Sequence, residues 1–196
     1  MLRLKKPLLT ENLFTRRIKE DQMSVHETGL KGYTIRDANR EDTKQIVQFI
    51  RDLADYEGFL HEVKATEEII EQSVFDEGAA NVVMAELDGE PIGFALFFYN
   101  FSTFEGRPGL YLEDLYIQPE YRNRGYGKKL LEFLAHKAHS RNCKRFEWWC
   151  LDTNTPSYEF YKGLDAEDMV DWTVFRIDGD TLINMSRDFE EGQKSK

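Results

Sequence analysis

The stretch Tyr111-Leu-Glu-Asp-Leu-Tyr-Ile-Gln-Pro-Glu-Tyr-Arg-Asn-Arg-Gly-Tyr-Gly-Lys128 predicts a strand, a short basic loop with two glycines, and a helix that begins near Gly127. The start of a helix presents unpaired backbone N–H groups and a partial positive charge. Glycines also let that backbone approach a ligand closely. Full positive charges come from four side chains: Arg122, Arg124, Lys128 and Lys129. The stretch therefore predicts a binding site for a phosphate-bearing ligand.

Two carboxylates, Glu113 and Asp114, lie on the predicted strand just before this loop. Phosphate binding beside residues that can exchange protons is typical of a cofactor-dependent transferase. The structural alternative is an ordinary strand–turn–helix, in which the glycines serve only the turn.

The same residues resemble the GNAT family of acetyl-coenzyme A-dependent N-acetyltransferases, whose motif is Arg/Gln-x-x-Gly-x-Gly/Ala. Arg122-Asn-Arg-Gly125-Tyr-Gly127 matches every required position, between an apolar strand and the helical run Leu130-Leu-Glu-Phe-Leu-Ala. The resemblance implies that the backbone of this loop holds the diphosphate of acetyl-coenzyme A. The cofactor-binding residues that it implies here are Leu115, Tyr116, Ile117, Arg122, Asn123, Arg124, Gly125, Tyr126, Gly127 and Lys128.

Composition narrows the possible functions. The chain has 196 residues, 41% of them hydrophobic, which suits one folded domain with a substantial core. A formal net charge of −10 argues against general binding to nucleic acid or anionic membranes and suits a cationic substrate. Cys143 and Cys150 have neither metal-site nor disulfide spacing, so we expect free thiols in a cytoplasmic protein and no metal site.

Hydrophobic periodicity and turn residues set the expected order of elements. The order begins with a strand at 33–37, helices at 39–58 and 66–75, and a hairpin of strands 81–87 and 92–100 around Asp88-Gly89. A strand at 110–118, a helix at 127–141 and a strand at 145–151 follow. The order ends with a short helix at 156–162 and a strand at 172–177 before an Asp178-Gly179 turn. This order resembles the GNAT fold, an α/β (α+β) architecture with a single mixed, mostly antiparallel sheet flanked by helices. We expect a GNAT domain at 33–188, a poorly ordered extension at 1–32 and a tail at 189–196.

Acetyl transfer requires a neutral amine, although alkylamines are mostly protonated at neutral pH. Glu113 is the candidate proton acceptor, and the resemblance implies that it contacts the amine. Asp114 points to the opposite side if the strand is regular, which favours a structural role. Tyr161 matches a family tyrosine that protonates the departing thiolate, and a packed ring is its alternative. Asn154 resembles a cofactor-binding asparagine, and a loop cap is its alternative.

The acceptor amine needs a pocket that recognises a cation. Aromatic faces and carboxylates suit that task, and the candidates, with core packing as the alternative, are Tyr56, Glu57, Glu113, Glu147 and Trp149. Within the family, the segments Tyr56-Glu57, Tyr111–Tyr116 and Phe160-Tyr161-Lys162 most resemble the diamine (spermidine/spermine) N-acetyltransferase group. Three residues depart from the usual family pattern: Asn123 in place of glycine, Thr153 in place of tryptophan, and a lone Asp171 in place of an acidic pair.

The sequence thus predicts direct acetyl transfer, in a ternary complex, to a primary amine of a small molecule. A diamine, a polyamine and an amino-acid side-chain amine are the leading acceptors. A protein or antibiotic amine and a non-catalytic acyl-coenzyme A-binding module are the alternatives. The resemblance also implies a homodimer.

Overall fold

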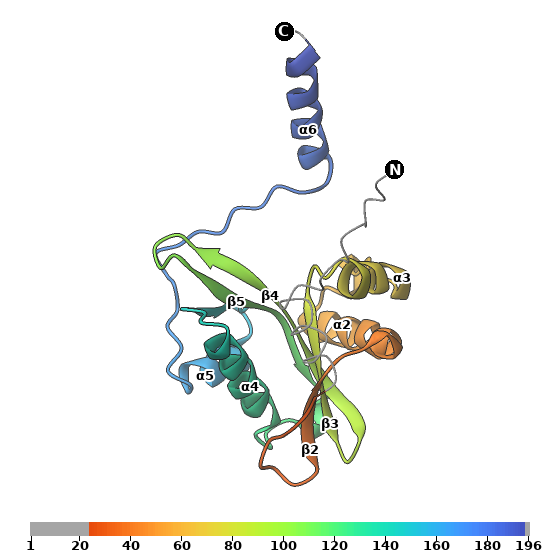
Figure 1. Cartoon of the computed structure of the whole chain (residues 1–196), viewed down its shortest axis with the longest axis vertical. Helices are drawn as coiled ribbons and strands as arrows, with labels where there is room; N and C mark the ends of the chain where they lie inside the picture. Colours follow the sequence, from red (N-terminus) through yellow and green to blue (C-terminus); the bar gives the residue numbers. More distant parts are fainter. Residues whose placement is uncertain (1–23, 195–196) are drawn as a thin grey trace, which may run out of the picture. The chain divides into compact units, whose positions relative to one another are not determined.

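A computed structural model describes residues 24–194 of the chain (Figure 1). The chain divides into two compact units, one that runs to Leu151 and one that begins at Asp152. Within the predicted extension, residues 25–27 form a strand, and residues 1–23 lie outside the described part of the chain.

The first unit is built on one sheet of six strands in the order β1-β2-β3-β4-β5-β6. All neighbours are antiparallel except β5 and β6, which are parallel. The predicted mixed, mostly antiparallel sheet is therefore confirmed. The strands are β1 (Val25–Glu27), β2 (Tyr33–Asp37), β3 (Asn81–Leu87), β4 (Glu90–Ser102), β5 (Arg107–Ile117) and β6 (Phe146–Trp148).

The turn between β3 and β4 is the one that its sequence predicts. Asp88 and Gly89 have φ angles of 52° and 87°, so both central residues lie in the left-handed region. Asp-Gly tolerates that conformation, and a turn of this kind matches the twist of the two strands that it joins.

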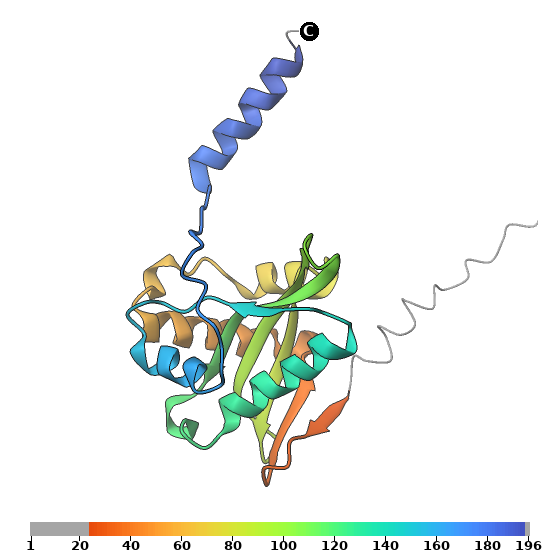
Figure 2. The same cartoon turned by 90° about the vertical axis from the view of Figure 1, so that its left-hand side faces the viewer.

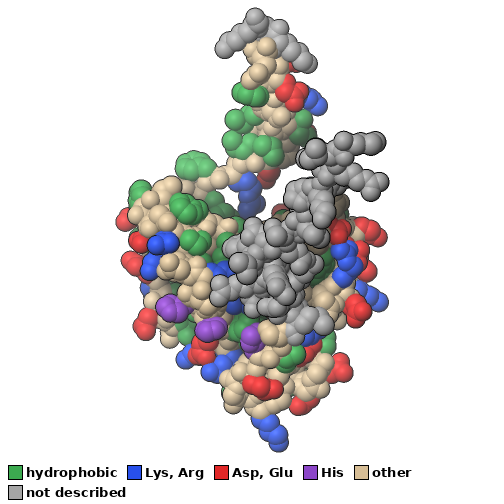
Figure 3. Space-filling view, in the orientation of Figure 1, with side chains coloured by type: hydrophobic (Ala, Val, Ile, Leu, Met, Phe, Trp, Pro, Cys, Tyr) green, Lys and Arg blue, Asp and Glu red, His purple; other side chains and the backbone are tan. Residues whose placement is uncertain are grey.

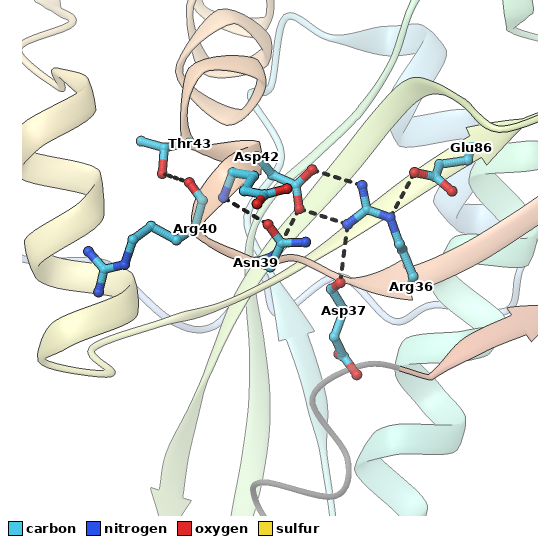
Figure 4. A network of polar contacts seen from close by, with 8 residues as sticks. Arg36, Asp37, Asn39, Arg40, Asp42, Thr43 and Glu86 are labelled. Carbon is cyan, nitrogen blue, oxygen red and sulfur yellow. Dashed lines mark hydrogen bonds and ion pairs between the residues drawn. The ribbon is translucent and has the colours of Figure 1, made fainter.

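The start of α2 (Thr43–Glu57) is fixed by polar contacts (Figure 4). Asn39 Oδ1 accepts a hydrogen bond from the backbone N–H of Glu41 at 2.8 Å and so caps a 3-10 turn, Arg40–Asp42, that leads into α2. Arg36 on β2 donates to both carboxylate oxygens of Asp42, at 2.7 and 2.8 Å, and to Glu86 on β3 at 2.7 Å. The helix ends at Gly58, with φ of 84°, which is the predicted stop.

Helices cover both faces of the sheet (Figure 2). On one face lie α2 and α3 (Glu67–Ile70), and α3 continues into a π-helical turn at Glu71–Asp76. Their core includes Phe49, which stacks on Phe94 with ring centroids 5.7 Å apart. On the other face lies α4 (Tyr126–Ser140), which buries Leu130, Leu131, Leu134 and Ala138. The junction between β5 and α4 thus belongs to a sheet that is packed between helices on both faces.

The second unit holds α5 (Thr155–Lys162) and α6 (Gly179–Lys194). The predicted strand at 172–177 is wrong, because these residues form neither strand nor helix. A strand needs a hydrogen-bonded neighbour, and none of the described strands pairs with this segment. The predicted Asp178-Gly179 turn is instead the beginning of α6, whose apolar side chains are exposed at the top of Figure 3.

None of the helices in residues 24–194 combines the length and the apolar character that crossing a lipid bilayer requires.

Candidate active site

The loop between β5 and α4 has the backbone geometry of its sequence pattern. A 3-10 turn, Pro119–Tyr121, leads from the end of β5 into residues 122–125. Asn123 and Gly125 have φ angles of 61° and 84°. Asparagine and glycine are the residues that tolerate this left-handed conformation, which explains why asparagine can occupy position 123.

The first turn of α4 presents backbone donors. The first helical hydrogen bond runs from the N–H of Lys129 to the carbonyl of Gly125, at 3.0 Å. The preceding N–H groups, those of Gly125, Tyr126, Gly127 and Lys128, therefore have no acceptor within the helix, and no side chain caps this end. A Cβ built on Gly127 would have its nearest neighbour, Leu115 Cδ2, at 3.9 Å, so the approach is open. These donors fit a phosphate group.

The four basic side chains predicted at the loop differ in exposure and in the groups that they contact. Lys128 is exposed, and Arg124, also exposed, donates to the carbonyl of Glu120 at 3.0 Å. Lys129 forms an ion pair with Glu132 at 2.7 Å. Arg122 is half-buried, and its Nε donates to the carbonyl of Ile117 at 2.8 Å.

The side chains of the two predicted tyrosines pack within the fold. The Tyr116 ring is 5% exposed and lies 5.7 Å from the Phe49 ring, and burial raises the pKa of its hydroxyl. The Tyr126 ring stacks on that of Tyr33 at 4.5 Å, and the Tyr33 hydroxyl donates to the Tyr126 carbonyl at 3.1 Å. Their side chains thus support the loop, so a contact with a cofactor would come from their backbones.

One edge of β5 is uncovered next to this loop. β6 pairs with residues 110–112 of β5 but not with residues 113–117. The N–H of Gln118 donates to the carbonyl of Ile92 at 2.9 Å, toward β4. Backbone groups alternate along a strand, so the N–H groups of Leu115 and Ile117 point to the opposite edge, the one that β6 leaves unpaired.

A β-bulge interrupts β5 at the two acidic residues. Leu96 pairs with Asp114, whereas the next residue, Phe97, pairs with Leu112, which leaves Glu113 as the extra residue. A bulge of this kind redirects side chains. The strand is therefore not regular here, so the condition for placing Glu113 and Asp114 on opposite sides is not met.

The bulge brings carboxylates into electrostatic contact. Glu113 is exposed, whereas Asp114 is half-buried. Burial, then the charge of Glu113, then that of Glu57 at the end of α2, raise the pKa of Asp114 to about 7. Burial also raises the pKa of Glu57. Asp114 is thus the group in this cluster that exchanges a proton near neutral pH, and sequence reasoning assigned it a structural role.

Aromatic rings line the neighbouring part of β4, β5 and β6. The Tyr111 ring lies 5.0 Å from that of Phe98 and meets Trp149 edge-on at 5.9 Å. Trp149 is 57% exposed, which suits a surface that contacts a ligand. Tyr111 and Phe98 were not predicted as site residues, and their pairing across β5 and β4 was the missing information.

Glu147 is a paired carboxylate. Its Oε2 accepts a hydrogen bond from Asn100 Nδ2 at 3.2 Å and lies 2.8 Å from Arg145 Nε. Glu147 pairs in register with Tyr111, so it belongs to the same region. Because Arg145 offsets its charge, Glu147 attracts a cation less than the exposed Glu113 does.

The remaining predicted site residues lie in the second unit. Asn154 Oδ1 accepts a hydrogen bond from the N–H of Ser157 at 3.3 Å and so caps α5. Tyr161 on α5 is half-buried, with its ring centroid 5.3 Å from that of Phe160. Their roles toward a cofactor stay predictions.

The fold is shared with solved structures. An integron cassette protein from V. cholerae superimposes with a TM-score of 0.68 at 24% identity, over 79% of this chain and 98% of that chain. The likeness shows the shared fold.

The family follows from sequence. Residues 46–165 match the model of the Acetyltransferase (GNAT) family, and the chain belongs to that family. It is 34% identical over 164 residues to a thialysine N-epsilon-acetyltransferase of Bos taurus, covering 78% of this chain and 96% of the relative. It is 37% identical over 90 residues to the L-ornithine N5-acetyltransferase NATA1 of Arabidopsis thaliana, covering 46% of this chain and 40% of the relative. The predicted family and acetyltransferase class are confirmed.

Proposed function

We propose that the protein transfers the acetyl group of acetyl-coenzyme A to the primary amine of a small diamine, polyamine or amino acid. The observation that carries this proposal is the open first turn of α4 next to an unpaired edge of β5 and a bulge that carries Glu113 and Asp114. Relatives named for thialysine and ornithine acetylation support an amino-acid side-chain amine as the acceptor.

The loop residues fit the cofactor. The N–H groups of Gly125, Tyr126, Gly127 and Lys128 would hold its diphosphate, with charge from Arg124 and Lys128. The N–H groups of Leu115 and Ile117, on the unpaired edge of β5, would hold the amide-containing arm. Acetyl-coenzyme A supplies the acetyl group as a reactive thioester.

The carboxylates would handle the proton of the amine. Glu113 is exposed and can meet an incoming ammonium group. Asp114 beside it, with a pKa raised to about 7, is ionised in a substantial fraction of molecules at neutral pH and can take up a proton there. Tyr161 would supply a proton to the departing thiolate, as the family resemblance implies.

The acceptor would bind between aromatic and acidic groups. Tyr56, 48% exposed, and Glu57 lie at the end of α2, and Trp149 is exposed beside Tyr111. Aromatic faces attract ammonium groups, and carboxylates neutralise them. Glu147, paired with Arg145, would act mainly by shaping this surface.

The proposal extends to assembly and compartment. Apolar side chains of the second unit are exposed, among them Trp172, Phe175 and Phe189 at 68%, 90% and 70%. Large exposed apolar surfaces mark interaction sites, which supports a homodimer. The net charge of −10 supports a protein that binds neither nucleic acid nor anionic membranes, and the two free cysteines support a cytoplasmic location.

A thiol-release assay over a panel of amines tests the function. The panel contains thialysine, ornithine, lysine, putrescine, spermidine, an aminoglycoside and a lysine-containing peptide, each with acetyl-coenzyme A. Release of coenzyme A with a small diamine or amino acid, at a rate above that with the peptide and the aminoglycoside, is the expected result. Preferential turnover of peptide or aminoglycoside would contradict the acceptor class, and cofactor binding without turnover of any amine would indicate a binding module.

A further inference from the structure

Arg122, the first residue of the phosphate-loop motif, lies at a junction of three elements. Its Nε donates to the carbonyl of Ile117, the last residue of β5, at 2.8 Å. Its guanidinium carbon lies 4.5 Å from the ring centroid of Tyr56 and 5.5 Å from that of Tyr116. The side chain therefore contacts the end of the strand, the end of α2 and the aromatic core together.

The contact with Ile117 closes the start of the loop. The Ile117 carbonyl lies on the edge of β5 that faces away from β4, since the next residue bonds to β4. Between these two residues, the chain makes a 3-10 turn in which the N–H of Arg122 donates to the carbonyl of Pro119 at 3.2 Å. Arg122 thus holds the start of the loop to the 3-10 turn through its backbone and to the end of β5 through its side chain.

The two rings next to the guanidinium differ in how exposed they are. Tyr116 is 5% exposed and packs against Phe49, so it is a fixed support. Tyr56 is 48% exposed at the last turn of α2, directly before Glu57. A guanidinium over an aromatic face is attracted to it electrostatically. The contact therefore restrains a residue of the proposed acceptor surface.

We propose that Arg122 is a positioning residue that links the cofactor loop to the acceptor surface through Tyr56. The link rests on the proposed function, because it assigns Tyr56 to the amine side and residues 123–128 to the cofactor side. A cofactor that orders the loop also orders Arg122, and Arg122 orders Tyr56 and its neighbour Glu57. Cofactor and amine then bind with positive coupling, and each raises the affinity for the other by the same factor.

The substitution Arg122→Lys distinguishes this positioning role from simple attraction of phosphate by a positive charge. Lysine keeps the positive charge but has neither the Nε–H that reaches the Ile117 carbonyl nor a planar group that lies over the Tyr56 ring. If Arg122 attracted phosphate as a point charge, Arg122→Lys would change little. As a linking residue, Arg122→Lys loses the coupling.

The experiment measures coupling directly. Calorimetry gives the Kd of coenzyme A with and without the best amine for four proteins: wild type, Arg122→Lys, Tyr56→Leu and the double variant. In wild type the amine is expected to lower this Kd by roughly fivefold. Each single variant is expected to reduce that factor to about one, with no further loss in the double variant. Tyr56→Phe, which keeps the ring, is expected to retain the coupling.

Arg124→Lys is the matched control. Arg124 lies 5.8 Å from the Tyr121 ring instead of Tyr56, so its variant is expected to change the Kd of coenzyme A and leave the coupling factor intact. Coupling that survives in Arg122→Lys, or single-variant losses that multiply in the double variant, would overturn the proposal.

A second double-variant cycle measures the free energy of unfolding of the same four proteins, and it needs no amine. It separates the link from the function: absence of turnover in wild type contradicts the proposed function alone, whereas independent effects of Arg122 and Tyr56 on unfolding contradict the link. Circular dichroism confirms that each variant is folded before the cycles are compared.

Discussion

At the scale of single residues, the acidic pair on β5 shows how one irregularity changes the chemistry. The bulge leaves Glu113 exposed and unpaired in the β4 register and leaves Asp114 half-buried. Burial, and then the charges of the neighbouring carboxylates, oppose ionisation of Asp114, whose pKa rises to about 7.

The first prediction is that Asp114→Asn stabilises the protein at high pH. The pKa of Asp114 is raised in the folded protein, from 3.8 to about 7, so the unfolded chain binds fewer protons between these values and stability falls as pH rises through them. The penalty is fully present above pH 7 and absent below about pH 4. Removing it is expected to raise the free energy of unfolding at pH 8 by roughly 2 kcal/mol, after allowance for partial exposure.

Urea denaturation of both proteins at pH 4 and pH 8 measures this effect. The gain is expected at pH 8 and not at pH 4. An equal gain at both values would show that the substitution acts through packing and not through the charge of Asp114.

The second prediction concerns Glu113 and Tyr161. Glu113→Gln and Tyr161→Phe are each expected to lower kcat by roughly 100-fold or more, since each removes a proton-transfer group. The Kd of coenzyme A should change by less than about threefold, because neither side chain forms the phosphate loop. Steady-state kinetics and calorimetry measure the two quantities, with Glu90→Gln at the first residue of β4 as the control. Kinetics unchanged from wild type in folded variants would remove both role assignments.

The residue scale also marks where sequence reasoning stops. Glu113 was predicted as a functional residue from its position on the strand and from the family resemblance, and that role stays a prediction. The proton chemistry of Asp114 was not predictable, because it depends on a bulge and on burial, and neither leaves a signal in the local sequence. Arg122 was assigned to phosphate by its charge, whereas its contacts join it to Ile117 and Tyr56.

At the scale of elements, the backbone of the loop before α4 is left-handed at two positions, and the residues at both positions tolerate that conformation. Asn123 and Gly125 both have positive φ, at 61° and 84°. This conformation aims consecutive backbone N–H groups toward one region, which is how such loops bind anions. The helix then begins at Tyr126 without a side-chain cap.

The third prediction is that Gly125→Ala weakens cofactor binding through backbone strain. A Cβ at Gly125 would meet nothing closer than Leu30 Cδ1 at 3.9 Å, so the space is sufficient and the φ of 84° is the difficulty. The strain is expected to cost about 1 kcal/mol in stability and to raise the Kd of coenzyme A by roughly tenfold.

Asn123→Gly provides the matched comparison for this prediction. It relaxes a residue with φ of 61°, so stability and cofactor affinity are expected to be unchanged or slightly higher. Thermal unfolding and calorimetry on both variants decide the point. Cofactor affinity in Gly125→Ala equal to that of wild type would contradict the assignment of this loop to the diphosphate.

Elements were predictable where local chemistry determines them. Gly58, at the end of the first predicted helix, and the Asp88-Gly89 turn carry signals that the structure confirms as a helix stop and a hairpin turn. The segment 172–177 has the composition of a strand but no neighbour to pair with among the described strands, so the composition misled. α6 was missed because the Asp-Gly signal favoured a turn over the amphipathic pattern that follows it.

At the scale of the whole molecule, acidic charge and exposed apolar surface are the two features to explain. A net charge of −10 favours cationic partners, consistent with a small amine. Many of the exposed apolar side chains belong to the second unit, on α6 and on the segment before it, although the first unit also exposes Phe101 and Phe104. Folded proteins rarely leave so many apolar groups in water without a partner.

The fourth prediction is that the protein is a homodimer whose interface includes these residues. Light scattering should give twice the chain mass of 23.1 kDa. Phe175→Lys, at a residue that is 90% exposed, is expected to shift the mass toward the monomer because it places a charge in an apolar interface. Lys31→Glu, a charge change on the first unit, serves as the control. A monomeric mass for wild type at all concentrations would contradict the assembly.

The central claim is that residues 122–128 bind the diphosphate of acetyl-coenzyme A. Isothermal titration calorimetry of the folded wild-type protein with coenzyme A, and with pantetheine, which lacks the diphosphate and the phosphorylated adenosine of coenzyme A, tests it most directly. The account predicts saturable binding of one coenzyme A per chain, weakened in Gly125→Ala, and far weaker binding of pantetheine. No binding of coenzyme A, or equal affinity for both compounds, would contradict it.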